Sequence, residues 1–266
     1  MPVFANDALK GKHALITGAT GGIGYETAVV LASMGASVTI TGRREEKLKQ
    51  LKNDVEKNVP DARMFPFAAD IGNENDRKKL VETACDANGF ISLLVNSAGV
   101  IGGGTVENLT QQEMENIMHI NYTSAVLLSQ LVYEKMREKK EGAIVNVSSL
   151  SGLRGTRGNT AYAASKFALI GFTHSMAVEA ITHGVRVNAV CPGYVETEMG
   201  QAAIKNKAIR ENRSFEDQLE ISKNSIPSGR LTDPKEVAHT IAYLLTDAAS
   251  NIVGESVKIS GGNVLR

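Results

Sequence analysis

Short apolar runs alternate along the chain with longer stretches in which apolar residues recur every three or four positions. The short runs are typical of buried strands, and the longer spacing is typical of helices that pack on a sheet. Strands are predicted at residues 12–17, 37–41, 63–68, 91–95, 142–147, 184–190 and 257–259. Helices are predicted at residues 25–34, 45–57, 73–88, 110–139 and 233–245, and another begins near residues 159–160. This alternation predicts the α/β class, with a doubly wound parallel sheet of about seven strands, the Rossmann fold.

A glycine-rich turn joins the first predicted strand to the first predicted helix. Residues 18–24 read Gly-Ala-Thr-Gly-Gly-Ile-Gly, and a second strand follows the helix. Glycines in this context permit a tight turn and let the backbone approach a pyrophosphate, which the N–H groups at the start of the helix then bind. The alternative is a purely structural turn, but the strand before it and the helix after it favour a dinucleotide site.

The end of the second predicted strand bears on the choice of dinucleotide. An acidic residue there would bind the ribose 2′-hydroxyl of NAD, but this chain has Arg43 and Arg44 and no acid. A guanidinium group can hold a 2′-phosphate through two hydrogen bonds, which favours NADP over NAD. The alternative is that these arginines merely begin the next helix on its solvated face.

Tyr162 and Lys166 lie four positions apart in the helix that begins near residue 160. Residues four apart share one face of a helix, so the phenol and the ammonium should point into the same space. A nearby ammonium is expected to lower the pKa of the phenol and to make it a usable acid and base for an alcohol oxygen. A surface pair of Tyr and Lys is the simpler alternative, because this spacing often arises by chance.

The candidate residues converge on one edge of the predicted sheet. In sheets of this kind ligands bind outside the carboxyl ends of the strands. The residues that follow strands or begin the next helix are the glycines at 18–24, Asp70, Asn96, Ser149, Tyr162, Pro192 and Gly193.

Composition removes several other classes of function. The chain has 266 residues, 42% of them hydrophobic, which is enough for one large domain over residues 1–266. Lys and Arg number 29 and so do Asp and Glu, a balance that argues against nucleic acid or an anionic membrane as a partner. No metal site is expected, and the absence of a signal-like start favours a cytoplasmic location.

Residues 194–226 look like a substrate-loop insert, whose polar stretch 198–223 is expected to be mobile and to order over bound substrate.

Taken together, these residues resemble the single-domain short-chain dehydrogenase/reductase family, from residue 12 to about residue 262. Two departures are visible, Ser97 where the family usually has Asn and Gly21 where many NADP-dependent members have a basic residue. The matching positions are Thr17, Gly18, Gly22, Gly24, Asp70, Asn96, Ala98, Gly99, Asn121, Ser149, Tyr162, Lys166, Pro192 and Gly193.

The resemblance implies a role for each of these residues. Tyr162 would protonate the carbonyl oxygen during reduction, Ser149 would hold that oxygen, and Lys166 would lower the pKa of Tyr162 and bind the nicotinamide ribose. Asn121 would keep a water in a proton relay to Lys166. The cofactor, NADP or alternatively NAD, would be bound by Gly18, Thr20, Gly22, Ile23, Gly24, Arg43, Arg44, Asp70, Ile71, Asn96, Ala98, Gly99, Tyr162, Lys166, Pro192, Gly193, Val195 and Thr197.

Three functions stay open on these residues. The first is an oxidoreductase that transfers a hydride between NADP(H) and a carbonyl or secondary alcohol, with a 3-oxoacyl thioester as one substrate class. The second is a nucleotide-sensing binding protein without turnover, and the third is a cofactor-free lyase, which usually lacks both the glycine turn and the lysine. The family also commonly forms homodimers or homotetramers, which the apolar faces near residues 114–136 and 167–178 would allow.

Overall fold

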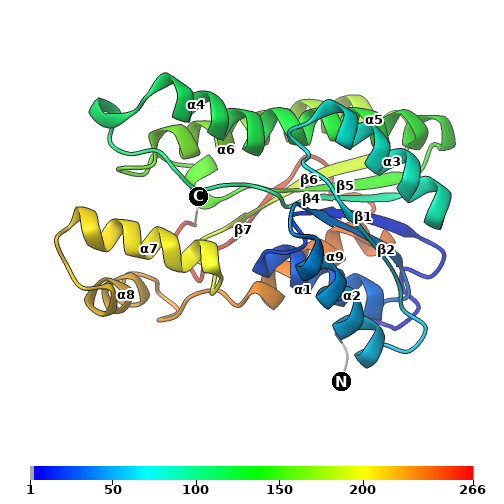
Figure 1. Ribbon diagram of the computed structural model, residues 1–266, viewed down its shortest axis with the longest axis horizontal. Helices are drawn as coiled ribbons and strands as arrows, with labels where there is room; N and C mark the ends of the chain where they lie inside the picture. Colours follow the sequence, from blue (N-terminus) through cyan, green and yellow to red (C-terminus); the bar gives the residue numbers. More distant parts are fainter. Residues whose placement is uncertain (1–2, 266) are drawn as a thin grey trace.

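The computed structural model describes residues 3–265, and its centre is one sheet of seven parallel strands (Figure 1). The strand order is β3-β2-β1-β4-β5-β6-β7, so the order reverses between β1 and β4. The strands are β1 (His13–Thr17), β2 (Ser37–Gly42), β3 (Arg63–Ala68), β4 (Leu93–Asn96), β5 (Gly142–Val147), β6 (Val185–Pro192) and β7 (Ser256–Ile259). The predicted fold is confirmed, and each predicted strand is present within a few residues of its expected bounds.

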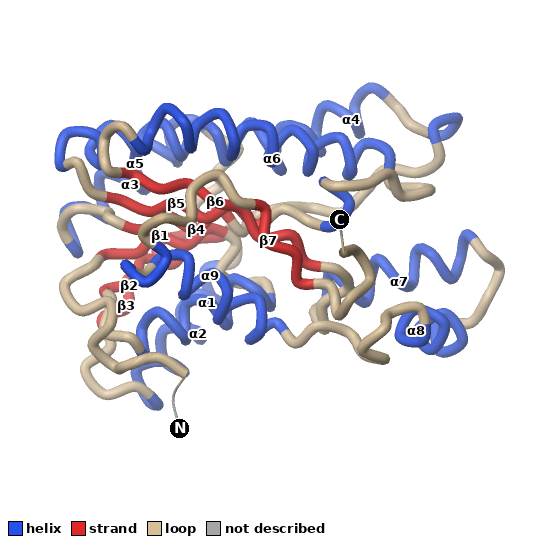
Figure 2. The backbone as a smooth tube through the Cα atoms, turned by 180° about the vertical axis from the view of Figure 1, so that it is seen from behind, coloured by secondary structure: helices blue, strands red, loops and turns tan. Residues whose placement is uncertain are grey.

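Helices cover both faces of the sheet. One layer holds α1 (Gly22–Ser33), α2 (Glu45–Asn58) and α9 (Pro234–Leu245), and the other holds α3 (Glu74–Asn88), α4 (Gln111–Met118), α5 (Ser124–Lys139) and α6 (Thr160–Ile181). Figure 2 shows the sheet from behind, between these two layers. No helix among residues 3–265 is both long enough and apolar enough to span a membrane.

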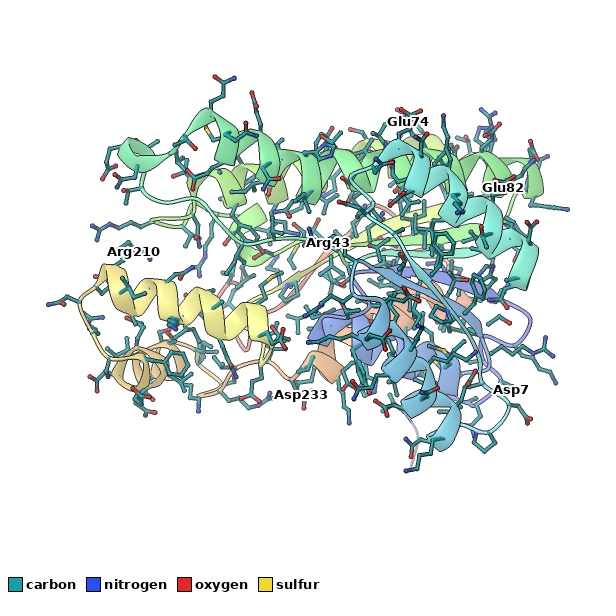
Figure 3. All side chains as sticks on the ribbon, viewed as in Figure 1. Asp7, Arg43, Glu74, Glu82, Arg210 and Asp233 are labelled. Carbon is teal, nitrogen blue, oxygen red and sulfur yellow. The ribbon has the colours of Figure 1, made fainter. Side chains whose placement is uncertain are left out.

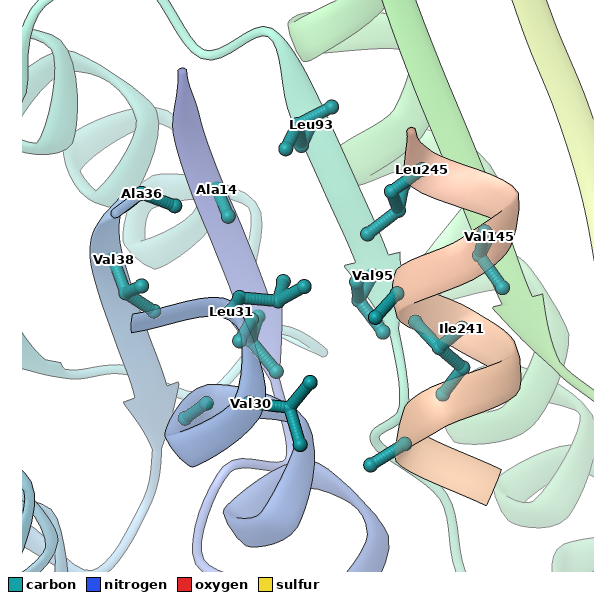
Figure 4. Close-up of a cluster of buried hydrophobic side chains, with 14 of the residues drawn as sticks. Ala14, Val30, Leu31, Ala36, Val38, Leu93, Val95, Val145, Ile241 and Leu245 are labelled. Atoms are coloured by element: carbon teal, nitrogen blue, oxygen red, sulfur yellow. The ribbon is translucent and has the colours of Figure 1, made fainter. Parts of the chain in front are cut away.

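Alternation along the strands supplies a separate hydrophobic cluster to each face. Ala14 and Ile16 of β1 pack with α1 and α9, whereas Leu15 between them faces the α3, α5 and α6 layer. Figure 4 shows the first cluster, in which Leu31 of α1 and Ile241 of α9 meet side chains from four strands. A strand that is buried on both faces needs apolar residues at successive positions, which is why the sequence showed continuous runs.

The helix predicted over residues 110–139 differs from the prediction in one respect. It begins after Thr110, whose hydroxyl accepts a hydrogen bond from the Glu113 N–H in a capping box. At His119–Thr123 it widens into a π-helical turn, and α5 continues beyond it. A π-turn adds one residue without changing the hydrophobic pattern enough to be recognised in the sequence, and such turns occur frequently at functional sites.

The polar insert is more ordered than its composition suggested. It forms α7 (Glu198–Arg210) and α8 (Phe215–Asn224), which begin at the capping residues Thr197 and Ser214. Ile204, Ile226 and Leu231 form a small buried cluster beneath the two helices. Both helices lie beyond the carboxyl ends of the strands, apart from the two layers on the sheet (Figure 1). The insert therefore has a small core of its own, and its expected mobility stays a prediction.

Candidate active site

A cavity of about 1030 Å³ lies along the carboxyl edge of the sheet, under α7. Its walls come from the β1–α1 turn, from the loops after β2 to β6, and from α7 itself. The predicted residues that line it are Gly18, Thr20, Gly22, Ile23, Gly24, Arg43, Arg44, Asp70, Ile71, Ala98, Gly99, Ser149, Tyr162, Lys166, Pro192, Gly193, Val195 and Thr197.

The glycine turn brings the backbone of two strand ends into close contact. Gly18 has a φ of +65°, and a Cβ atom there would lie 2.7 Å from the Cα of Ala98. A Cβ on Gly22 would lie 2.5 Å from Cγ2 of Thr197. The Thr17 hydroxyl holds the facing loop because it accepts hydrogen bonds of 3.1 Å from the N–H groups of Ser97 and Ala98. These close approaches leave backbone N–H groups at the start of α1 facing the cavity, which fits a pyrophosphate.

The two arginines after β2 differ in their surroundings. Arg44 donates to both the carbonyl oxygen and the hydroxyl of Thr20, at 3.0 and 3.1 Å, and its Nη1 lies 3.9 Å from a carboxylate oxygen of Glu198. Arg43, which Figure 3 labels, is exposed and forms no hydrogen bond or ion pair within residues 3–265. Arg43 is thus the guanidinium that is available to a phosphate, whereas Arg44 braces the glycine turn.

Ser149, Tyr162 and Lys166 meet at the middle of the cavity. Ser149 follows β5, and its hydroxyl accepts a hydrogen bond of 3.1 Å from the Ser151 N–H. Lys166 is 5% exposed, and its Nζ donates to the carbonyl oxygen of Val147 at 2.9 Å. The same Nζ lies 5.7 Å from the centroid of the Tyr162 ring. The ammonium therefore faces the ring and the end of β5.

The electrostatics of this group differ from the sequence-based expectation. Burial raises the pKa of Tyr162, and the Ser149 hydroxyl lowers it in part. Burial also lowers the pKa of Lys166 to about 8, with a small opposing effect from Cys191. Desolvation of the phenolate determines the direction of the shift, and no lowering by Lys166 accompanies it, in contrast to the expectation from the sequence. Tyr162 is therefore a protonated phenol at neutral pH.

Asn121 lies in the π-helical turn and is 1% exposed. Its side-chain oxygen accepts from the Val100 N–H at 2.8 Å, and its amide donates to the Val100 carbonyl oxygen and to the Ser165 hydroxyl, both at 3.0 Å. A Cβ on Gly99 would lie 3.2 Å from Oδ1 of Asn121 and 3.5 Å from Nζ of Lys166. Asn121 is thus beside Lys166, behind the wall of the cavity, and it positions the loop that separates them.

Asn96 does not line the cavity with its side chain, and its expected role at the cofactor stays a prediction. The side chain is 3% exposed and donates to the hydroxyl of Ser129 and to Oδ1 of Asn146, both at 2.9 Å. Asn146 in turn donates to Thr173. Because successive residues of a strand point to opposite faces, Asn96 is directed into the layer of α5 and α6, while residues 97–99 line the cavity.

Several lining residues were not identified from the sequence. The predicted insert at residues 194–226 lines the cavity through its part from Tyr194 to Glu211. Beyond Gly200 the sequence indicated this segment as a whole and no single residue in it. The residues that line the cavity there are Ala203, Asn206, Lys207, Ile209, Arg210 and Glu211, and Asn263 lies outside every predicted segment.

Comparison with known proteins agrees with this geometry. Residues 12–208 match a family model described as short chain dehydrogenase. The chain belongs to the short-chain dehydrogenase family. It is similar to the 3-oxoacyl-[acyl-carrier-protein] reductase FabG of Vibrio cholerae, with 35% identity over 96% of this chain and 98% of that protein. The corresponding reductase of Thermotoga maritima is 34% identical, over 97% of this chain and 99% of the relative.

Solved structures of short-chain dehydrogenases overlay closely. Levodione reductase has a TM-score of 0.92 at 32% identity, covering 96% of this chain and 98% of its own. An actinorhodin polyketide ketoreductase with NADPH has a TM-score of 0.92 at 30% identity, covering 98% and 99% of the two chains. A xylitol dehydrogenase with bound NAD⁺ has a TM-score of 0.91 at 28% identity, covering 96% and 99%. The chain is accordingly an NAD(P)-dependent oxidoreductase, and both nicotinamide cofactors occur among its structural neighbours.

Proposed function

We propose that this protein transfers a hydride between NADP(H) and a carbonyl or secondary alcohol, with Tyr162 as the general acid and base. The observation that carries the proposal is the meeting of Ser149, Tyr162 and Lys166 in the cavity that the glycine turn also lines. When bound, the cofactor supplies the hydride, and the protein binds, orients and protonates. The close-packed glycines at positions 18 and 22 fit its pyrophosphate.

The proton chemistry follows from the burial of the phenol. Because the pKa of Tyr162 is raised, the hydroxyl carries its proton at neutral pH and can donate it to a carbonyl oxygen that becomes an alkoxide. Ser149 lies within reach of the same oxygen and would polarise the carbonyl as a second donor. Lys166 would assist as a cation near the ring, and Asn121 would hold the loop around Lys166 in place. Reduction is the direction that a protonated Tyr162 favours.

The choice of NADP rests on Arg43. It is exposed on the cavity wall after β2, no acidic residue occupies that strand end, and no partner within residues 3–265 neutralises it. A 2′-phosphate would supply the missing counter-charge. The NADPH in the ketoreductase structure supports this choice, whereas the NAD⁺ of the xylitol dehydrogenase keeps NAD as the alternative.

The substrate class that we propose is a ketone, with a 3-oxoacyl thioester as the specific case. The support comes from the relatives in Vibrio cholerae and Thermotoga maritima, whose names state a 3-oxoacyl-[acyl-carrier-protein] substrate. A nucleotide-sensing protein without turnover would need the glycine turn alone, so the presence of Ser149, Tyr162 and Lys166 together counts against it.

The test is a set of ketones, aldehydes and 3-oxoacyl thioesters assayed in parallel with NADPH and NADH, following the absorbance of the reduced cofactor. Tyr162→Phe removes the proton donor and is expected to lower turnover by at least about 100-fold, while NADPH still binds. Tyr243→Phe is the matched control, since that phenol lies on α9, is 40% exposed and is outside the cavity wall. Full activity of the Tyr162 variant, or tight NADPH binding without turnover of any carbonyl, would reject the proposal.

We also propose that the protein forms a homodimer or homotetramer and works in the cytoplasm. Support for assembly comes from the large apolar side chains that α6 exposes, among them Phe167 at 46% and Val178 at 73%. Sedimentation equilibrium of the wild type and of Val178→Glu tests this. A wild type that stays monomeric at micromolar concentration would refute it.

A further inference from the structure

The end of the cavity away from the glycine turn carries more positive charge than the proposed reaction uses. Arg154 and Arg157 belong to the loop before α6, whereas Lys207 and Arg210 lie in the last turns of α7, and all four line the cavity. Glu211 is the acidic residue that lines this end. Figure 3 labels Arg210 where the end of α7 approaches the loop before α6. The cations therefore gather from two sides of one opening.

Arg210 occupies a defined position in this group. Gly158 has a φ of +73°, and a Cβ atom there would lie 2.7 Å from Cζ of Arg210, so the guanidinium packs directly on the backbone of the loop. Its closest acidic neighbour is an oxygen of Glu211, 3.8 Å from Nε, which is too long for a hydrogen bond. Nε is buried without a hydrogen-bond partner in the described part of the chain. The packing thus fixes the guanidinium while its hydrogen-bonding capacity is unused.

Arg154 lines the cavity together with Arg210. Its side chain is exposed and forms no ion pair or hydrogen bond with any residue from 3 to 265. Both positive charges act on the Tyr194 hydroxyl. Burial raises the pKa of Tyr194, and the charges of Arg210 and Arg154 oppose that rise. Nη1 of Arg157 lies 3.8 Å from Oε1 of Glu211, the same carboxylate that Arg210 approaches. Glu211 thus serves two arginines, and the charge of Arg157 also acts on Glu107. Arg154 and Lys207 form no ion pair within residues 3–265.

We infer that Arg154, Arg157, Lys207 and Arg210 form a subsite for an anionic group, a carboxylate or a phosphate ester, at the end of the substrate remote from its carbonyl. The inference rests on the proposed function, since it names which carbonyl compounds the site selects. Guanidinium groups match the oxygens of carboxylates and phosphates, and a cavity wall that excludes part of the solvent strengthens the attraction. A substrate with a neutral tail leaves these cations uncompensated.

Two pairs of substrates, each differing in one anionic group, test the subsite. The first pair is 5-oxohexanoate and its methyl ester, and the second is the acetoacetyl thioester of pantetheine with and without its 4′-phosphate. For the wild type, kcat/KM with NADPH should be higher for the anionic member of at least one pair. Arg154→Gln and Arg210→Gln should each lower this preference by about tenfold at low salt, the loss expected for one charge-assisted contact. Increasing ionic strength should weaken the preference of the wild type.

Lys205→Gln is the matched control, since it removes a positive charge from the exposed side of the same helix without touching the cavity wall. It should leave the preference unchanged. Arg154→Gln is expected to fold, because the Arg154 side chain forms no described hydrogen bond or ion pair that the substitution would break. A preference confined to the carboxylate pair or to the phosphate pair supports the subsite and identifies the source of the anion.

Equal kcat/KM values within both pairs in the wild type would overturn the inference, as would a preference that both arginine variants retain. Calorimetric titration of the wild type and of Arg210→Gln with 5-oxohexanoate gives the same comparison without turnover. Loss of binding in the variant supports the subsite even if no substrate reacts. Absence of reaction in every assay would then reject the proposed function alone.

Discussion

Lys166 holds its charge at a cost in stability that can be measured. The side chain is 5% exposed, and burial lowers its pKa from the ordinary value of 10.5 to about 8. That lowering corresponds to about 3 kcal/mol by which the folded chain disfavours the ammonium. Removal of the amine leaves the Val147 carbonyl oxygen without its hydrogen bond, which takes back about 1–2 kcal/mol of the gain. Lys166→Met, which keeps an unbranched chain of similar length, is therefore expected to be about 1–2 kcal/mol more stable than the wild type at pH 7.

The difference in free energy of unfolding between the wild type and Lys166→Met should change with pH, in favour of the wild type as the pH rises. Below about pH 8 the amine is protonated in the folded and unfolded states, so the wild type bears the full cost. Between about pH 8 and pH 10.5 the unfolded state binds more protons than the folded state, and the wild type gains stability relative to the variant. Above that window the amine is neutral in both states. Urea unfolding should show that, from pH 7 to pH 10, the free energy of unfolding of the wild type rises by about 2–3 kcal/mol relative to that of Lys166→Met.

The comparison has a direct control and a clear refutation. Lys205→Met removes an exposed ammonium from α7 and accounts for any general effect of losing one lysine charge. The reasoning would be refuted if the variant exceeds the wild type in free energy of unfolding by the same amount at both pH values, or by a larger amount at pH 10. If the variant is more stable and also inactive, the buried charge is kept for function at the expense of stability.

Two further changes examine the cofactor end of the cavity. Gly18→Ala should lower the free energy of unfolding by about 2–4 kcal/mol and weaken NADPH binding, because its Cβ would lie 2.7 Å from the Ala98 backbone at a φ of +65°; unchanged thermal unfolding would contradict this. Gly21→Arg should fold, since Gly21 has an extended backbone and its Cβ would meet only the Gly18 carbonyl oxygen at 3.4 Å. It should tighten NADPH relative to NADH by about 5–10-fold in fluorescence titrations, and an unaltered ratio would argue against a phosphate at this position.

The sheet could be predicted because burial on both faces leaves a local trace. A central parallel strand must be apolar at successive positions, and the run at residues 142–147 gave the bounds of β5 without any tertiary knowledge. The glycine turn was equally visible, since close backbone approach at Gly18 excludes every larger side chain. The residues that the structure places around the cavity are mostly those that follow strand ends, where the geometry of a parallel sheet brings distant segments together.

Other features depend on contacts that no local pattern records. The π-helical turn around Asn121 follows from the amide bonding to Val100 and Ser165, which are distant in the sequence. The direction of Asn96 depends on its register in β4, because a shift of one residue would turn its side chain to the opposite face of the sheet, toward the layer of α1 and α9. The raised pKa of Tyr162 reflects the desolvation of its phenol by the surrounding chain, which the spacing of Tyr162 and Lys166 could not reveal.

The insert contacts the rest of the chain at both ends of α7. At its N-terminus, Glu198 of α7 lies 3.4 Å from Lys47 and 3.9 Å from Arg44, and these exposed ion pairs contribute about 0–1 kcal/mol each. At its C-terminus, Arg210 packs on Gly158. A small cluster around Ile204 and Leu231 packs beneath the middle of the helix pair. The insert is predicted to be mobile, and α7 carries two of the four cations that we assign to substrate. Selection of an anionic substrate and closure of the cavity would then depend on the same helix.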